Sequence, residues 1–259
     1  MKLLNFLTLF QIGTLVIVLI ESIRIVETKK AIAAAFFTFG AASVLLSDLY
    51  WLAYDILRPD TRMPFAANEI GEWAMFLLYG ASLKSRHPLR WQEAKGEIAA
   101  IFVFISVSVF LWGAWSGEWI QDLLTGAAYG YYLICLFLRI KEEDIFSLCE
   151  SLLLGITCTV LLTAQVSTLL VPASISEWLT SFCNALLLTG NAVFLGRAVL
   201  SFCRKETSQQ VLCRVFAAFA WIITAMYMSS GIPYSISTVL LTFCFALMPL
   251  AFRKEAESA

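Results

Sequence analysis

The stretch RMPFAANEIGEWAMFLLYG, residues 62–80, decides how many times this chain crosses a membrane. It begins a hydrophobic segment, but Glu69 and Glu72 stand three residues apart at the start of that segment. Ionisable side chains are rare inside membrane helices, because each costs about 2.5–3.5 kcal/mol at the bilayer centre. Residues 68–84 therefore either form a short membrane span in which the two carboxylates have a role, or do not cross the membrane.

The composition of the whole chain is typical of a protein embedded in lipid. It has 259 residues, of which 60% are hydrophobic and 14% are charged, whereas a soluble domain is roughly half apolar and a quarter charged. The apolar runs are continuous rather than alternating, which indicates helices and excludes a membrane β-barrel. Because a bilayer core about 30 Å thick needs roughly 20 residues per helix, we predict an all-α, polytopic transmembrane helix bundle.

Nine segments have the length and composition of membrane spans, and the count becomes eight if residues 68–84 do not cross. The loops between them are short, so the chain is expected to form a single integral-membrane helical domain, residues 1–259, without a soluble domain. Function must then reside in the bundle, in its loops or in a partner. The predicted spans are 3–26, 31–57, 68–84, 97–115, 119–140, 146–171, 176–202, 211–230 and 232–252.

The lysines and arginines distinguish nine spans from eight, because basic residues gather on the cytoplasmic side of membrane helices. With nine spans and an outer N-terminus, 15 of the 18 Lys and Arg fall on the inner side, and this asymmetry collapses if residues 68–84 do not cross. Most tryptophans fall near the proposed outer ends, where indole rings prefer the membrane interface. We therefore expect nine spans, an outer N-terminus and a cytoplasmic C-terminus, in the plasma membrane of a bacterial cell.

The residue inventory excludes several kinds of membrane enzyme. The one histidine, His87, lies in a predicted inner loop, so neither a Ser–His dyad nor a histidine-ligated zinc site is available within the bilayer. Nucleotide-binding motifs are absent, and a net charge of −1 offers no basic field to nucleic acid. The seven cysteines form no CxxC pair, which favours a role as small core residues. We expect no cofactor, no metal and no nucleic-acid partner.

Acidic residues gather at the predicted outer ends of the second and third spans. Asp48 and Asp55 are seven residues apart and so lie on one helix face, as do Glu69 and Glu72. Helices joined by so short a loop are antiparallel neighbours, which would let the two carboxylate pairs face each other. The candidate ligand or proton site comprises Asp48, Asp55, Arg62, Asn68, Glu69 and Glu72.

Two interpretations of this acidic cluster remain open. In the structural one, Asn68 caps the third helix, the glutamates complement its positive N-terminal dipole, and an arginine neutralises a carboxylate at the interface. In the functional one, the carboxylates line an outward-opening cavity and hold a proton or bind a cation. Asp48 favours the functional interpretation, because it lies about two turns deeper than Asp55 and needs a polar partner there.

Amide side chains are the candidate partners for such a buried carboxylate. Gln11 lies in the first predicted span and Gln165 in the sixth. The seventh span carries a secondary polar stripe, Asn184 and Asn191, again seven residues apart. Each amide alone also fits simple helix packing, since interhelical hydrogen bonds of this kind contribute only about 0.6 kcal/mol.

Three functions fit the sequence. The first is a small secondary transporter or ion-coupled permease with an acidic site at the extracytoplasmic face, although no inverted repeat is visible. The second is a non-catalytic membrane sensor, or a partner-binding or assembly subunit, whose short basic cytoplasmic loops dock a protein or anionic lipid. The third is a carboxylate-based intramembrane lipid enzyme that uses Asp48 with Glu69 or Glu72 as acid and base. We expect transport rather than catalysis, with the lipid bilayer and a small ion or solute as partners.

Overall fold

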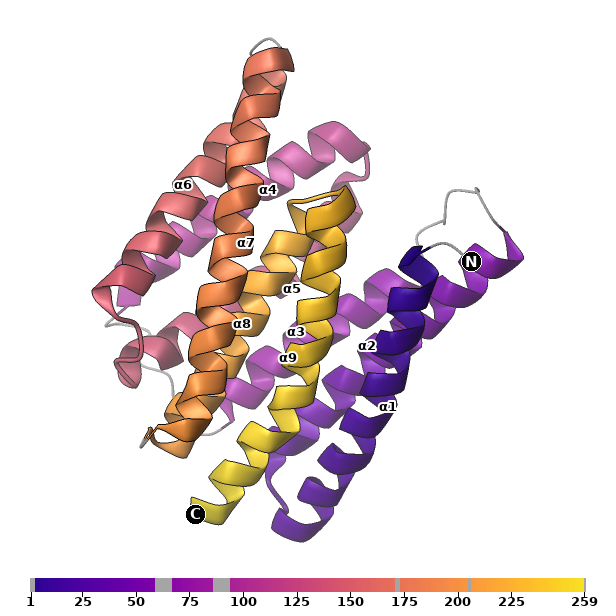
Figure 1. Cartoon of the computed structure of the whole chain (residues 1–259), viewed down its shortest axis with the longest axis vertical. Helices are drawn as coiled ribbons and strands as arrows, with labels where there is room; N and C mark the ends of the chain where they lie inside the picture. The colour runs from indigo at the N-terminus through magenta and orange to yellow at the C-terminus, as the bar shows by residue number, and fades with distance from the viewer. Residues whose placement is uncertain (1–2, 59–66, 86–93, 171–172, 205, 259) are drawn as a thin grey trace.

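The computed structural model of the protein, shown in Figure 1, describes residues 3–58, 67–85, 94–170, 173–204 and 206–258. Within these ranges the chain forms helices and no strands, which confirms the predicted all-α bundle. Successive helices run in opposite directions (Figure 1). The helices in the described ranges are α1 (Leu3–Lys29), α2 (Ile32–Leu57), α3 (Ala67–Lys84), α4 (Lys95–Ser116), α5 (Trp119–Glu142), α6 (Leu148–Leu170), α7 (Ala173–Cys203), α8 (Ser208–Tyr227) and α9 (Gly231–Ser258).

Eight of the described helices are long and apolar enough to cross a membrane, so the chain is a multi-pass membrane protein. The exception is α3, which has 18 residues and carries Glu69, Glu72 and Lys84. Composition alone therefore does not identify α3 as a span. Its place in the bundle has to be read from its contacts with the neighbouring helices.

Helix α3 lies antiparallel to α2 over most of its length. Ser47 Oγ donates a hydrogen bond of 2.8 Å to the carbonyl oxygen of Asn68 near one end, and Ser82 Oγ donates one of 2.8 Å to that of Ala33 near the other. These anchor points lie about 21 Å apart along α2, at 1.5 Å per residue. Because α2 is itself long and apolar enough to cross, this pairing agrees with nine crossings.

The centre of the bundle is an aromatic core contributed by α3, α5 and α8. Tyr79 is fully buried and packs edge-on against Phe216 and Phe219, with ring centroids 5.6 and 5.3 Å apart. Tyr132 is also fully buried, and its hydroxyl donates a hydrogen bond of 2.8 Å to the carbonyl oxygen of Phe216. Close packing and interhelical hydrogen bonds are what hold membrane helices together, since lipid is as apolar as a leucine side chain.

Charged residues divide the bundle into two unlike ends. We call the end at which the even-numbered helices begin the basic end. The acidic cluster lies at the opposite end, which is the outer side in the predicted orientation. Apart from Arg58, every Lys and Arg of the described ranges lies at or near the basic end: Arg24, Lys29, Lys30, Lys84, Lys95, Arg139, Lys141, Arg197, Arg204, Arg214, Arg253 and Lys254. Which end faces the cytoplasm stays a prediction.

Candidate functional site

A cavity of about 210 Å³ lies between α1, α2, α3, α8 and α9, in the half of the bundle opposite the basic end. Its wall extends from the ends of helices, at Asn68, Tyr227 and Tyr234, to Met75 and Phe245 deeper in the bundle. We call it the carboxylate cavity, because Asp48 and Glu72 both line it.

The two carboxylates reach the cavity from different helices, and each has a neutral partner. Asp48, on α2, accepts a hydrogen bond of 2.8 Å from Gln11 Nε2 of α1. Gln11 is held in turn by Thr242 of α9, whose Oγ1 donates to Gln11 Oε1 at 3.2 Å. Glu72, on α3, accepts a hydrogen bond of 2.7 Å from the hydroxyl of Tyr227 on α8. Five helices are thus joined around these two carboxylates through uncharged groups.

The electrostatic balance of the cavity is negative. None of the described residues that line it is basic, whereas Asp48 and Glu72 both line it. Charges interact strongly where water is scarce, so two carboxylates without a basic partner attract a proton or a cation. The rings of Trp51, Tyr227 and Tyr234 also line the wall, and aromatic faces attract cations.

Asn68 adds an unused acceptor to this wall. It lines the cavity, and its Oδ1 atom is buried without a hydrogen-bond partner among the described residues. Because α3 begins at Ala67, Asn68 lies within the first turn and not at the N-cap that the structural interpretation assigns to it. A buried acceptor without a partner is costly, which favours an N–H or O–H group of a ligand near this position.

The other carboxylates of the predicted cluster lie outside the cavity. Asp55 accepts a hydrogen bond of 2.9 Å from Asn5 Nδ2 on α1, and Glu69 accepts one of 3.3 Å from Gln121 Nε2 on α5. The two carboxylate pairs therefore do not form one continuous site. The structure brings together Asp48, Asn68 and Glu72, and Arg62 lies outside the described residues.

The secondary polar stripe of α7 is separate from this cavity. Asn191 is fully buried and its Nδ2 donates a hydrogen bond of 3.0 Å to Ser237 Oγ on α9. Asn184 is partly buried, and neither asparagine lines the carboxylate cavity. The contact of Asn191 joins two helices, which fits the packing interpretation of the stripe.

Sequence reasoning did not identify Tyr227 and Tyr234 as site residues. They flank the short connection between α8 and α9, so the predicted topology already places them on the same side of the membrane as the acidic cluster. The missing information was that α8 and α9 pack beside α1, α2 and α3. Gln11, by contrast, was identified as a candidate partner and does bind Asp48.

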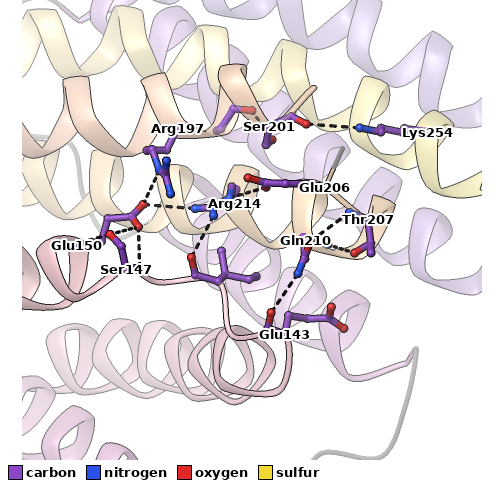
Figure 2. A network of polar contacts seen from close by, with 12 residues as sticks. Glu143, Ser147, Glu150, Arg197, Ser201, Glu206, Thr207, Gln210, Arg214 and Lys254 are labelled. Atoms are coloured by element: carbon purple, nitrogen blue, oxygen red, sulfur yellow. Dashed lines mark hydrogen bonds and ion pairs between the residues drawn. The ribbon is translucent and has the colours of Figure 1, made fainter. Parts of the chain in front are cut away.

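A second polar cluster joins α6, α7 and α8 at the basic end (Figure 2). Glu150 is only 3% exposed and accepts hydrogen bonds from Ser147 N at 2.9 Å and Ser147 Oγ at 2.7 Å. Its other oxygen lies 3.3 Å from both Arg197 Nε and Arg214 Nη1. Arg214 is 8% exposed and also contacts Glu206 at 2.6 Å. We call these five residues the Glu150 network.

Further polar contacts tie other helices together at the same end. Arg139 Nε, on α5, donates to the carbonyl oxygen of Leu83 on α3 at 3.0 Å. Lys254 Nζ, on α9, lies 3.4 Å from the carbonyl oxygen of Ser201 on α7, as Figure 2 shows. From the sequence, these basic residues indicate only the topology of the chain. In the structure Arg139 and Lys254 also form contacts between helices at the basic end.

Comparisons of the chain with protein-family models, with characterised proteins and with solved structures give no match. The fold defines the class, a multi-pass helical membrane protein. The function within that class therefore has to be argued from the geometry of the site.

Proposed function

We propose that the protein is an ion-coupled carrier of a small solute, and that the carboxylate cavity is its binding site at the predicted outer face. The observation that carries the proposal is the pair Asp48 and Glu72, which share one cavity without a basic residue in its described lining. Such a site is favourable only when a proton or a cation offsets the charge. Secondary transporters place their coupling-ion and substrate sites inside the helix bundle in this way.

The size and lining of the cavity favour a small, positively charged solute. About 210 Å³ is below the roughly 300–1,000 Å³ of sites for drug-sized ligands, so the solute has few non-hydrogen atoms. Carboxylates and aromatic rings together suit an ammonium group. Asn68 Oδ1 supplies an additional acceptor for an N–H or O–H group.

Competition for the same carboxylates would couple the solute to protons. A cationic solute and a proton both offset the charge of Asp48 and Glu72, so binding of one disfavours binding of the other. The polar contacts at the basic end hold the helices together there, so the cavity is reached from the opposite end. Transport then requires the helices around the cavity to separate at the basic end, where Arg253 of α9 contacts Glu21 of α1 at 2.7 Å, in the manner of two helix groups that rock about a central site.

The experiment is uptake of radiolabelled tetramethylammonium into proteoliposomes with an acidic interior. This cation is small and permanently charged, so it does not cross the lipid as a neutral amine. We expect gradient-driven uptake by the unchanged protein and at least a tenfold loss in Asp48→Asn and in Glu72→Gln. Asp55→Asn and Glu69→Gln are matched controls, because these carboxylates lie outside the cavity, and they are expected to retain uptake within twofold.

The same preparations separate a carrier from a non-catalytic sensor or binding subunit. Equilibrium binding of labelled tetramethylammonium that depends on Asp48 and Glu72, but without uptake, would favour the sensor. Equal loss of uptake in all four variants would contradict the cavity as the site. Absence of both binding and uptake in the unchanged protein would overturn the preference for a cationic solute.

A further inference from the structure

A second cavity, of about 310 Å³, lies between α4, α5, α6, α7 and α8. It shares no lining residue with the carboxylate cavity. Its wall consists mainly of aliphatic and aromatic side chains, among them Ile101, Phe137 and Leu161. Towards the basic end the wall includes Glu97, which forms an ion pair of 2.6 Å with Lys141. We call it the apolar cavity.

The polar groups deep in the wall of the apolar cavity are occupied by the protein itself. The hydroxyl of Tyr129 lies 2.5 Å from Thr224 Oγ1, and Trp221 Nε1 donates a hydrogen bond of 3.0 Å to the carbonyl oxygen of Leu187. Thr157 is the exception, with a buried hydroxyl that has no described partner. A helical threonine can satisfy this hydroxyl on the carbonyl one turn back by rotating χ1. An occupant therefore needs no hydrogen bonds in the interior of this cavity.

The apolar cavity is continuous with the surface that faces lipid. Ser151 and Gly155 of α6 line it and are themselves exposed. Beside them Leu152 and Ile156 are 54% and 53% exposed, on a helix long and apolar enough to cross a membrane. Apolar cavities exclude water, and an empty one loses the dispersion contacts of its lining. The molecule that surrounds this surface is lipid.

We propose that the apolar cavity binds one hydrocarbon chain of a membrane phospholipid. The chain enters beside α6, at Ser151 and Gly155, and lies against Trp221 and Leu161. The headgroup stays at the basic end, where Glu97 and Lys141 present charges of both signs, with side chains 42% and 47% exposed. Because the two cavities share no lining residue, this inference stands or falls independently of the proposed transport function.

The test places a larger side chain at Gly155, on the exposed edge of the cavity. A β-carbon at this position would meet no atom within 4 Å, so Gly155→Leu projects into open space without a clash. Gly13→Leu is the matched control, because Gly13 has equally open surroundings and lies on the exposed face of α1. If Gly155→Leu does not fold, Cys158→Phe, which alters the same wall, carries the same expectation.

Trp221 reports occupation, because bromine atoms on a lipid chain quench tryptophan emission on contact. Each protein is placed in bilayers of dioleoyl and of dibromostearoyl phosphatidylcholine. The contribution of Trp221 is the difference between that protein and its Trp221→Phe counterpart. We expect the brominated chain to reduce this contribution at least twofold in the unchanged protein and in Gly13→Leu. In Gly155→Leu the reduction should be lost.

Mass spectrometry of the purified proteins supplies an independent count. The unchanged protein should retain about one phospholipid per chain more than Gly155→Leu does. An unquenched Trp221 in the unchanged protein, or equal quenching in Gly155→Leu, would overturn the proposal. So would retention of an apolar molecule other than a phospholipid in place of the lipid.

Discussion

The buried charges at the basic end allow a stability prediction with a defined magnitude. Glu150 is 3% exposed and contacts Arg197 and Arg214 through one carboxylate oxygen. Glu150→Gln keeps the shape of the side chain and an acceptor oxygen but removes the charge. Arg214, which is 8% exposed, is then left with Glu206 as its carboxylate partner among the described residues.

Removing one partner of a buried ion pair costs about 3–5 kcal/mol, because the other charge stays buried without compensation. The lower end of this range applies here. Arg214 retains Glu206 at 2.6 Å, and the side chain of Arg197 is 30% exposed. We therefore expect Glu150→Gln to lower the free energy of unfolding by about 3 kcal/mol, which is more than a hundredfold in the unfolding equilibrium constant.

Glu21 provides the matched control, because it also contacts two arginines. It lies 2.6 Å from Arg24 and 2.7 Å from Arg253, but its side chain is 29% exposed and theirs are 66% and 53% exposed. Exposed pairs contribute about 0.2–1 kcal/mol, so Glu21→Gln should cost less than 1 kcal/mol. The measurement is unfolding of both variants in mixed micelles titrated with dodecyl sulfate. A cost for Glu150→Gln no larger than that for Glu21→Gln would refute the reasoning.

Two further predictions concern the ends of the bundle. Cys213 is 4% exposed and lies next to Arg214 in the chain. In a background without the exposed Cys149 and Cys203, Glu150→Gln should raise the rate at which N-ethylmaleimide alkylates Cys213 at least tenfold. An unchanged rate would mean that the Glu150 network does not limit access to Cys213. Glu72→Gln keeps the acceptor for the Tyr227 hydroxyl and removes an uncompensated charge, so it should leave the free energy of unfolding equal or higher; a loss above 1 kcal/mol in the same titration would contradict the charge balance assigned to the cavity.

The positions of the helices follow closely from the sequence. The predicted span 31–57 corresponds to α2 at Ile32–Leu57, and 119–140 corresponds to α5 at Trp119–Glu142. Continuous apolar runs bounded by charged or turn residues suffice for this. The seven-residue spacing of Asp48 and Asp55 was also informative, because the structure places both side chains against α1.

The neighbours of each helix do not follow from the sequence. Glu72 and Tyr227 are 155 positions apart, and Gln11 and Thr242 are 231 positions apart. In a soluble helix the apolar stripe reveals which face is buried. In a membrane helix both the buried and the lipid-facing sides are apolar, so the pattern that fixes the span leaves its orientation open. The sequence therefore could not predict that, of the four carboxylates in the cluster, two share a cavity and two do not.

Glu150 and Glu72 differ in how the described residues compensate their charge. Glu150 lies on α6 and Glu72 on α3, and both accept hydrogen bonds. Glu150 faces two arginines, so its charge is compensated within the protein and its contacts hold three helices together. Glu72 faces a phenol and a second carboxylate in a cavity whose described lining contains no base. Among the described lining residues Glu72 therefore has no basic partner, and a carboxylate whose charge a proton or solute can offset is the kind of group on which the proposed transport would depend.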